Sequence, residues 1–230
     1  MIQIWALALT LLLATDASAA EPLRLTKPAS SSAFPRIATP GGPAAAKINA
    51  ALDRLDRRWA GFVRECRAGG KDNEAGRSVR VTLAGPRFLS LVANDEESCG
   101  GAHPDISTLA LVYDLGAGRP VDWKPLLGPR LVTETSADTV IDGTTIGMIG
   151  SKTLRDLYVR TDKPDKDCAE ALADPGLHFV AWLDGKRRAL VIQPVLPHVV
   201  AACADDAAIP AVDLRRLGAD PALTAALAGG

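Results

Sequence analysis

A tight glycine turn between two runs suited to β-sheet constrains the fold of this chain more than any other feature. The turn is Cys99-Gly100-Gly101-Ala102-His103-Pro104. It follows Phe88 to Ala93, which is apolar on both faces, and precedes Thr108 to Tyr113, where larger and smaller residues alternate. The glycine pair allows positive φ, or close approach of another segment, without a Cβ clash. The pattern predicts two neighbouring strands that meet at one end of a sheet.

His103 is the residue of the turn whose side chain could take part in proton transfer or in hydrogen bonding. It precedes Pro104, which favours an extended backbone, so we expect its imidazole to project from the end of the sheet. A single histidine in a turn usually fixes the loop through a backbone hydrogen bond. Catalysis would also need a nucleophile and an orienting group, and the local candidates are Ser90, Ser98 and Asp105, without a known motif spacing. His103 and Asp105 are therefore retained as catalytic candidates only.

The first residues have the pattern of an export signal. Ile2 to Ala14 is an apolar run, and Ala17-Ser18-Ala19 behind it is the small-x-small pattern of a signal-peptidase site. The run is shorter than the roughly 20 residues of a spanning helix. We therefore predict a signal peptide over residues 1–19, cleavage near Ala19, a periplasmic or secreted product, and no transmembrane anchor after cleavage.

The four cysteines of an exported chain are expected to form disulfides. Cys66 closes a predicted helix beside the strands that contain Cys99, whereas Cys168 and Cys203 flank a second predicted hairpin. Of the three possible connectivities, the local solution pairs Cys66 with Cys99 and Cys168 with Cys203. Each bridge would contribute about 3–4 kcal/mol by loop entropy. A thiolate nucleophile at Cys99, acting with His103, would need a free thiol and competes with this pairing.

Metal and nucleic-acid partners are not expected. The chain has no Cys-x-x-Cys and its histidines are not closely spaced, so we predict no metal site and no cofactor. The 26 basic and 27 acidic residues give a formal net charge of −1, which provides no electrostatic footprint for phosphates. Aromatic residues make up 4% of the chain and offer few stacking platforms for bases.

The remaining pattern predicts an α+β fold. Residues 20–42, rich in Pro, Ser and Gly, indicate an extended lead-in, and residues 43–230 a single domain with a possible helix-and-sheet subregion at 33–85. A long helix is predicted from Pro43 by apolar residues at steps of three or four. We expect an antiparallel or mixed sheet built from hairpins, packed against this helix and short C-terminal helices, with two disulfides. Residues 129–150 give no clear element.

Several motifs together resemble a bacterial extracytoplasmic domain family of unassigned function. These are Pro35-Arg36-Ile37, Ile48-Asn49, Phe88 to Leu91, Gly100-Gly101-Ala102-His103, Tyr113-Asp114-Leu115 and Asp122-Trp123. That family occurs in a lysozyme-sensing anti-sigma factor and as an accessory domain of some peptidoglycan deacetylases. The resemblance implies partner binding, and it draws attention to Gly100, Gly101, Ala102 and His103 as a binding corner. Two departures, Cys99 and Gly116-Ala117-Gly118-Arg119 in place of Thr-Gly-Lys, mean that no family binding residue transfers directly.

Three functions are consistent with the sequence. The first is a secreted or periplasmic non-enzymatic domain that binds a cell-envelope protein or glycan. The second is a cell-wall hydrolase that uses His103 with a carboxylate such as Asp105 or Asp95, and the third is a purely structural, disulfide-stabilised domain. A G-x-S-x-G elbow, a His-rich metal cluster and a phosphate loop are all missing from the sequence, which argues against an enzyme. We therefore predict binding.

Overall fold

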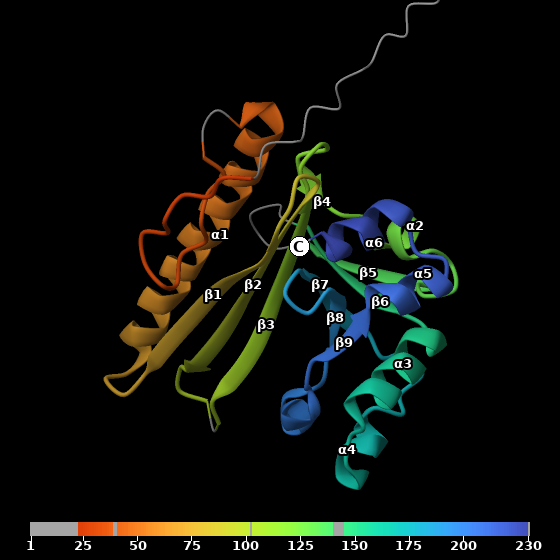
Figure 1. Ribbon diagram of the computed structural model, residues 1–230. Coiled ribbons are helices and arrows are strands. Elements are labelled where there is room, and N and C mark those ends of the chain that lie inside the picture. The colour runs from red at the N-terminus through yellow and green to blue at the C-terminus, as the bar shows by residue number, and fades with distance from the viewer. Residues whose placement is uncertain (1–22, 39–40, 102, 140–144, 230) are drawn as a thin grey trace, which may run out of the picture.

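The protein contains two antiparallel sheets and one long helix, in an α+β arrangement (Figure 1). The structure is a computed structural model and describes residues 23–38, 41–101, 103–139 and 145–229. The helix α1 (Gly42–Gly69) covers one face of the first sheet, and the second sheet packs against the other face. The predicted fold class is confirmed, with two sheets instead of one. The predicted signal peptide lies outside the described residues.

The first sheet is a meander in the order β1-β2-β3-β4. Its strands are β1 (Glu74–Ala84), β2 (Phe88–Ser98), β3 (Asp105–Asp114) and β4 (Arg119–Pro120). The second sheet follows the order β5-β6-β7-β8-β9. Its strands are β5 (Glu134–Thr139), β6 (Thr145–Gly150), β7 (Phe179–Asp184), β8 (Ala189–Pro194) and β9 (Ala207–Pro210).

Short helices surround the second sheet. They are α2 (Trp123–Leu127), α3 (Lys152–Asp162), α4 (Lys166–Ala171), the 3₁₀ helix η1 (His198–Cys203), α5 (Ala211–Arg216) and α6 (Pro221–Ala228). The N-cap residues Ser151 and Asp220 accept hydrogen bonds from backbone N–H groups at the starts of α3 and α6. The fourth strand ends at Pro120, and Asp122 caps α2.

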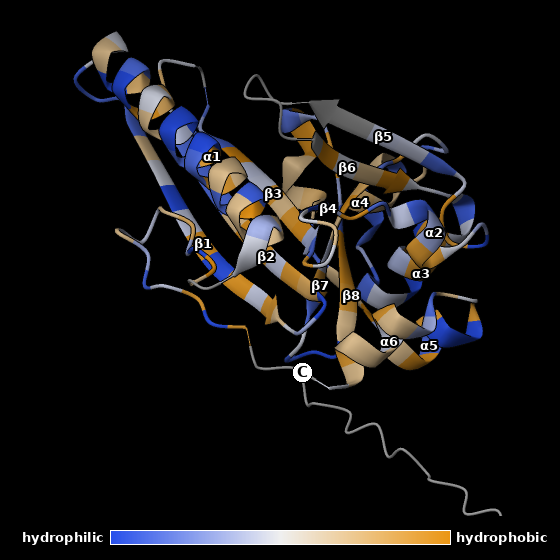
Figure 2. Ribbon diagram, turned by 90° about the horizontal axis from the view of Figure 1, so that it is seen from above, coloured by the Kyte–Doolittle hydropathy of each residue, from blue (hydrophilic) through white to orange (hydrophobic). Residues whose placement is uncertain are grey.

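The alternation of side chains along β2 and β3 divides the core into two clusters. Leu89 and Leu91 point to α1, where they pack with Leu52 and other apolar residues of the helix. Phe88 and Val92 point to the opposite face, where they join the larger core of the second sheet and the C-terminal helices. Figure 2 shows hydrophobic residues concentrated where β2, β3, β7 and β8 meet. The first sheet is thus buried on both faces at this end.

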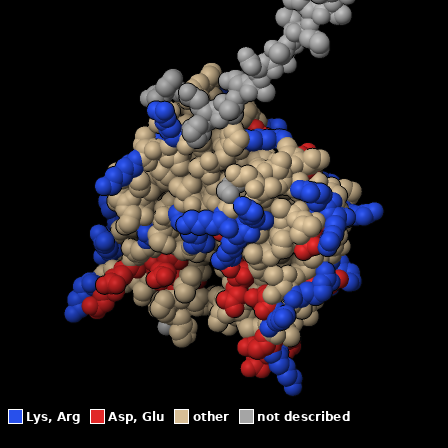
Figure 3. All heavy atoms as spheres, viewed as in Figure 1, with Lys and Arg blue, Asp and Glu red and all other residues tan. Residues whose placement is uncertain are grey.

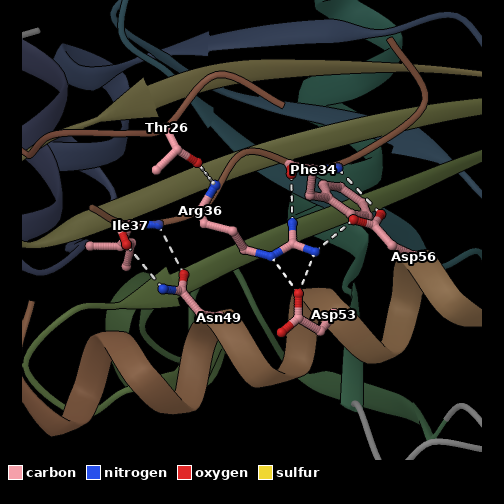
Figure 4. A network of polar contacts seen from close by, with 7 residues as sticks. All are labelled: Thr26, Phe34, Arg36, Ile37, Asn49, Asp53 and Asp56. Atoms are coloured by element: carbon pink, nitrogen blue, oxygen red, sulfur yellow. Dashed lines mark hydrogen bonds and ion pairs between the residues drawn. The ribbon is translucent and has the colours of Figure 1, made fainter. Parts of the chain in front are cut away.

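The lead-in is fastened to α1 by polar contacts (Figure 4). The side chain of Asn49 bonds both backbone groups of Ile37, with distances of 2.9 Å to its nitrogen and 3.0 Å to its oxygen. Arg36 donates to Asp53 at 2.8 Å and to Asp56 at 2.7 Å. Each buried or half-buried backbone group satisfied in this way contributes about 1 kcal/mol. This clamp explains why an extended segment without regular structure lies in one position.

Both predicted disulfides are confirmed. Cys66–Cys99 joins the last turn of α1 to the end of the β2 strand, and Cys168–Cys203 joins α4 to η1. The first bridge therefore ties the helix to the glycine turn. Among the described residues no cysteine is free.

Residues 129–150, for which the sequence predicts no element, contribute the β5–β6 hairpin. Its centre, residues 140–144, lies outside the described part. β6 pairs with β7 through one residue pair only, Ile149 with Phe179, whereas β7 and β8 pair along their full length. Across the described ranges, no helix combines the length and the apolar character that crossing a bilayer requires.

A candidate binding groove at the edge of β3

A groove of about 700 Å³ runs along the first half of β3. One wall comes from Trp59 and Phe62 of α1, and the other from Met148 of β6 and Val195 after β8. Residues 105–109 of β3 lie between these walls. We call this feature the β3 groove. In the space-filling view, a notch opens at the lower edge of the molecule with acidic residues on both sides (Figure 3).

Exposed apolar side chains gather around this groove. Ile106 is 63% exposed and Val195 is 45% exposed, and both line the groove. They come from β3 and from the segment after β8, so the fold brings together residues that are distant in sequence. Grouped apolar exposure of this kind marks interaction sites more often than isolated exposed residues do.

The structure brings the predicted candidates His103 and Asp105 together with a third residue, His198. Asp105 Oδ1 lies 3.2 Å from His198 Nδ1, and the His103 ring stacks on His198 with 6.1 Å between ring centroids. His198 is not packed in the core, since 46% of its side chain is exposed. No sequence signal identified this contact, because it joins residues 93 positions apart.

The glycine turn lies at the end of the groove. Gly100 adopts φ of +88°, one of the two possibilities that the sequence left open for the glycine pair. Gly101 is exposed, whereas Ala102 lies outside the described residues. The predicted binding corner therefore borders the groove through His103 and Pro104, and Pro104 is part of its lining.

Charged side chains of both signs line the groove. They are the carboxylates of Asp95, Glu97 and Asp105 and the guanidinium groups of Arg58 and Arg77. Arg77 donates two hydrogen bonds of 2.6 Å to Asp95 and lies 4.2 Å above the ring of Trp59. Burial, and then the negative charges of Asp105 and Asp95, raise the pKa of Glu97 above its usual value. Within the described part of the chain, no three side chains form a metal-binding group.

Ser90, one of the local nucleophile candidates, has a structural position. It is fully buried and its hydroxyl accepts hydrogen bonds from Thr82 Oγ1 at 2.8 Å and from the backbone nitrogen of Leu183 at 3.1 Å. The second of these contacts ties β7 to the first part of β2. A hydroxyl in this position has no access to a substrate in the groove.

Fold and groove define a class of protein: a two-sheet α+β domain with one long covering helix and an open strand edge. A crystal structure of a DUF3298 family member from Bacteroides fragilis is similar to it, with a TM-score of 0.53 and 14% sequence identity over 86% of each chain. At this identity the similarity concerns the fold. No protein-family model matches the sequence, and the comparison with curated proteins gives no match. The neighbour comes from a bacterial family of unknown function, which agrees at that level with the resemblance inferred from sequence.

Proposed function

We propose that this protein is an exported, non-enzymatic domain that binds a cell-envelope partner in the β3 groove. The observation that carries the proposal is that two exposed apolar residues, Ile106 and Val195, line one groove together with Trp59 and Phe62. A monomeric surface rarely leaves such residues together without a partner. The apparent leader at residues 1–19 and the two disulfides support an oxidising, extracytoplasmic location.

The chemistry of the groove suits recognition. Trp59 and Phe62 offer rigid aromatic surface on one wall, and a rim of carboxylates offers charge complementarity to a cationic group. The carboxylate of Asp105 is engaged by His198 and not by His103, so the pair expected for catalysis is arranged differently. These features favour binding over bond cleavage.

Site-directed photo-crosslinking tests the proposal. A benzophenone amino acid is placed at Ile106, in the groove, and in a second variant at Val212 of α5, whose side chain is 50% exposed and lies outside the groove. Both mature proteins are irradiated in envelope extract from a bacterium that produces the protein, and adducts are identified by mass spectrometry. We expect a specific adduct from Ile106 alone. Equal labelling at both positions, or none at Ile106, contradicts the proposal, and the second result would leave a purely structural role.

A second candidate function, cell-wall hydrolysis, is favoured by one observation, the contact of Asp105 with His198. A carboxylate that orients an imidazole is a general-base arrangement. If the protein hydrolyses purified peptidoglycan, His198→Ala should lower the rate by about 10²-fold or more, with His103→Ala as the comparison. Turnover that is undetectable, or unchanged in both variants, removes this function.

A further inference from the structure

β3 has one covered edge and one largely open edge. β2 pairs with all ten residues of β3, from Asp105 to Asp114. On the other side, β4 pairs only with Tyr113 and Asp114. Among the described residues, no strand pairs with positions 105–111 on that side. An open strand edge is a template for pairing with another chain.

One hydrogen bond of β3 shows which of its backbone groups face the open edge. The Val112 carbonyl accepts from the Val121 N–H at 2.8 Å, so Val112 directs its backbone groups away from β2. In an antiparallel strand, residues two positions apart direct these groups to the same side. Thr108 and Ile106 therefore present backbone groups to the β3 groove. The Ile106 N–H is held by the Asp105 carboxylate at 2.9 Å, which leaves the Thr108 pair and the Ile106 carbonyl.

The walls of the groove match the two faces of a strand. Side chains of an extended segment alternate between opposite sides. Beside β3, one set would meet Leu55, Trp59 and Phe62 of α1, and the other Met148 and Val195. An added strand would thus bury apolar side chains on both faces, as β2 does further along.

The carboxylates of Glu97 and Asp105 favour a positively charged group of a partner. Glu97 and Asp105 lie in the same lining, and the negative charge of Asp105 raises the cost of ionising Glu97. Arg77 is already bonded to Asp95, and among the described residues no Lys or Arg forms an ion pair with Glu97. A Lys or Arg from a partner would neutralise this cluster.

We propose that the β3 groove binds an extended polypeptide segment, which adds to β3 as a further strand and places a Lys or Arg beside Glu97 and Asp105. This inference rests on the proposed function and identifies the partner as a protein. A glycan has no regular alternation of N–H and C=O groups to pair with Thr108, whereas strand addition uses that array for affinity and the alternating side chains for specificity.

The first test uses a phage-displayed library of random decapeptides, selected against the mature chain. We expect enriched sequences in which apolar residues alternate, with Lys or Arg near one end. In the complex with the best synthetic peptide, amide exchange at Thr108 should slow by at least about tenfold, as expected for a new ladder bond. Exchange at Ser107 and Leu109, whose amides face β2, should change little.

A pair of variants isolates the backbone contact. Thr108→Pro and Thr108→Val both remove the hydroxyl that accepts from Asn94, but only the proline removes the N–H directed into the groove. Peptide affinity should fall about tenfold or more in Thr108→Pro, which corresponds to one lost hydrogen bond. In Thr108→Val it should remain within about threefold of the unmodified protein. If the proline variant does not fold, the exchange pattern of the unmodified protein still decides.

The outcomes separate the two proposals. Peptides that bind without slowing exchange at Thr108 overturn strand addition but leave the groove as a binding site. The same conclusion follows if the library gives no binder while the Ile106 crosslink yields a glycan adduct. Failure of the Ile106 crosslink removes the proposed function itself. A peptide whose Lys or Arg can be replaced by Gln without loss of affinity contradicts the role of Glu97 and Asp105.

Discussion

The two ends of β2 and β3 are built from different residues and have different roles. At one end, Phe88 to Ala93 and Ala110 to Tyr113 are buried between α1 and the second sheet. At the other end, Asn94 to Ser98 are polar and half-buried or exposed, and Asp105 to Ser107 are exposed. One hairpin therefore anchors the domain at its apolar end and presents an open edge at its polar end. The change from apolar to polar residues along β2 and β3 therefore sets where the groove begins.

The polar end is held by links that need little buried surface. Cys66–Cys99 connects it to α1, and Arg77 with Asp95 connects β1 to β2. Across the sheet, Asn94 donates to Thr108 at 3.0 Å. Covalent and polar links can keep a strand end in place while leaving one of its edges open. The following predictions test this contrast, beginning with the largest expected effect.

Removing a buried aromatic side chain at the apolar end should lower the stability of the protein most. Phe88→Ala deletes a fully buried ring and should lower the free energy of unfolding by about 3–5 kcal/mol. Ile106→Ala, at the exposed end of β3, should change it by less than about 0.5 kcal/mol. Urea unfolding monitored by circular dichroism measures both. Similar losses for the two variants would refute the contrast between the ends.

Removing the covalent link of the polar end should have the next largest effect. Cys66→Ser with Cys99→Ser should destabilise the protein by about 3–4 kcal/mol, because it opens a loop with a separation of 33 residues. Cys168→Ser with Cys203→Ser is a matched control with a separation of 35. Only the first pair should accelerate amide exchange between Asn94 and Ser98. Equal acceleration by the control pair would show that the bridge acts globally.

The hydrogen bonds that hold the lead-in to α1 should contribute less to the stability of the protein. Asn49→Ala removes two hydrogen bonds to Ile37 and should cost about 2 kcal/mol. The loss belongs to the apolar end, where Ile37 packs with the α1 cluster, so peptide affinity in the β3 groove should be unaffected. Thermal unfolding and a binding titration provide the two readouts. A fall in affinity as large as the fall in stability would contradict this separation.

The smallest effect concerns the charge of Glu97. Its raised pKa means that the folded protein holds this proton to higher pH than the unfolded chain, so stability falls as pH rises from 4.5 through the raised pKa. Glu97→Gln removes that fall and should increase stability at neutral pH by up to about 0.5 kcal/mol. Glu96→Gln, one residue away on the opposite face of β2, is the control. Unfolding curves from pH 4 to pH 7 should diverge for Glu97→Gln only.

Local patterns predicted the parts of the fold that depend on neighbours in sequence. The spacing of Ile48, Leu52 and Leu55 predicted α1, and the Asp184-Gly185 turn predicted the β7–β8 hairpin. The disulfide pairing followed because each cysteine lies beside a partner on an adjoining element. The β5–β6 hairpin was not predictable, since Gly147 and Gly150 interrupt its apolar pattern and its pairing depends on the second sheet.

The candidate site was predictable only in part. His103 and Asp105 were chosen from the glycine turn, and both border the groove or line it. His198, Trp59 and Val195 come from distant segments, and no local signal relates them to β3. The open edge itself depends on the length of β4, which ends at Pro120 after two residues. Such a property belongs to sheet topology and cannot be derived from side-chain periodicity.

The hydroxyl of Ser90 affects how fast a partner can bind in the β3 groove. Because it accepts a hydrogen bond from the Leu183 backbone, it holds a strand of the second sheet against β2 within the free protein. The recognition surface is therefore preorganised, and docking requires little rearrangement of the domain. The association rate should then be governed by diffusional encounter and by the ordering of the incoming segment.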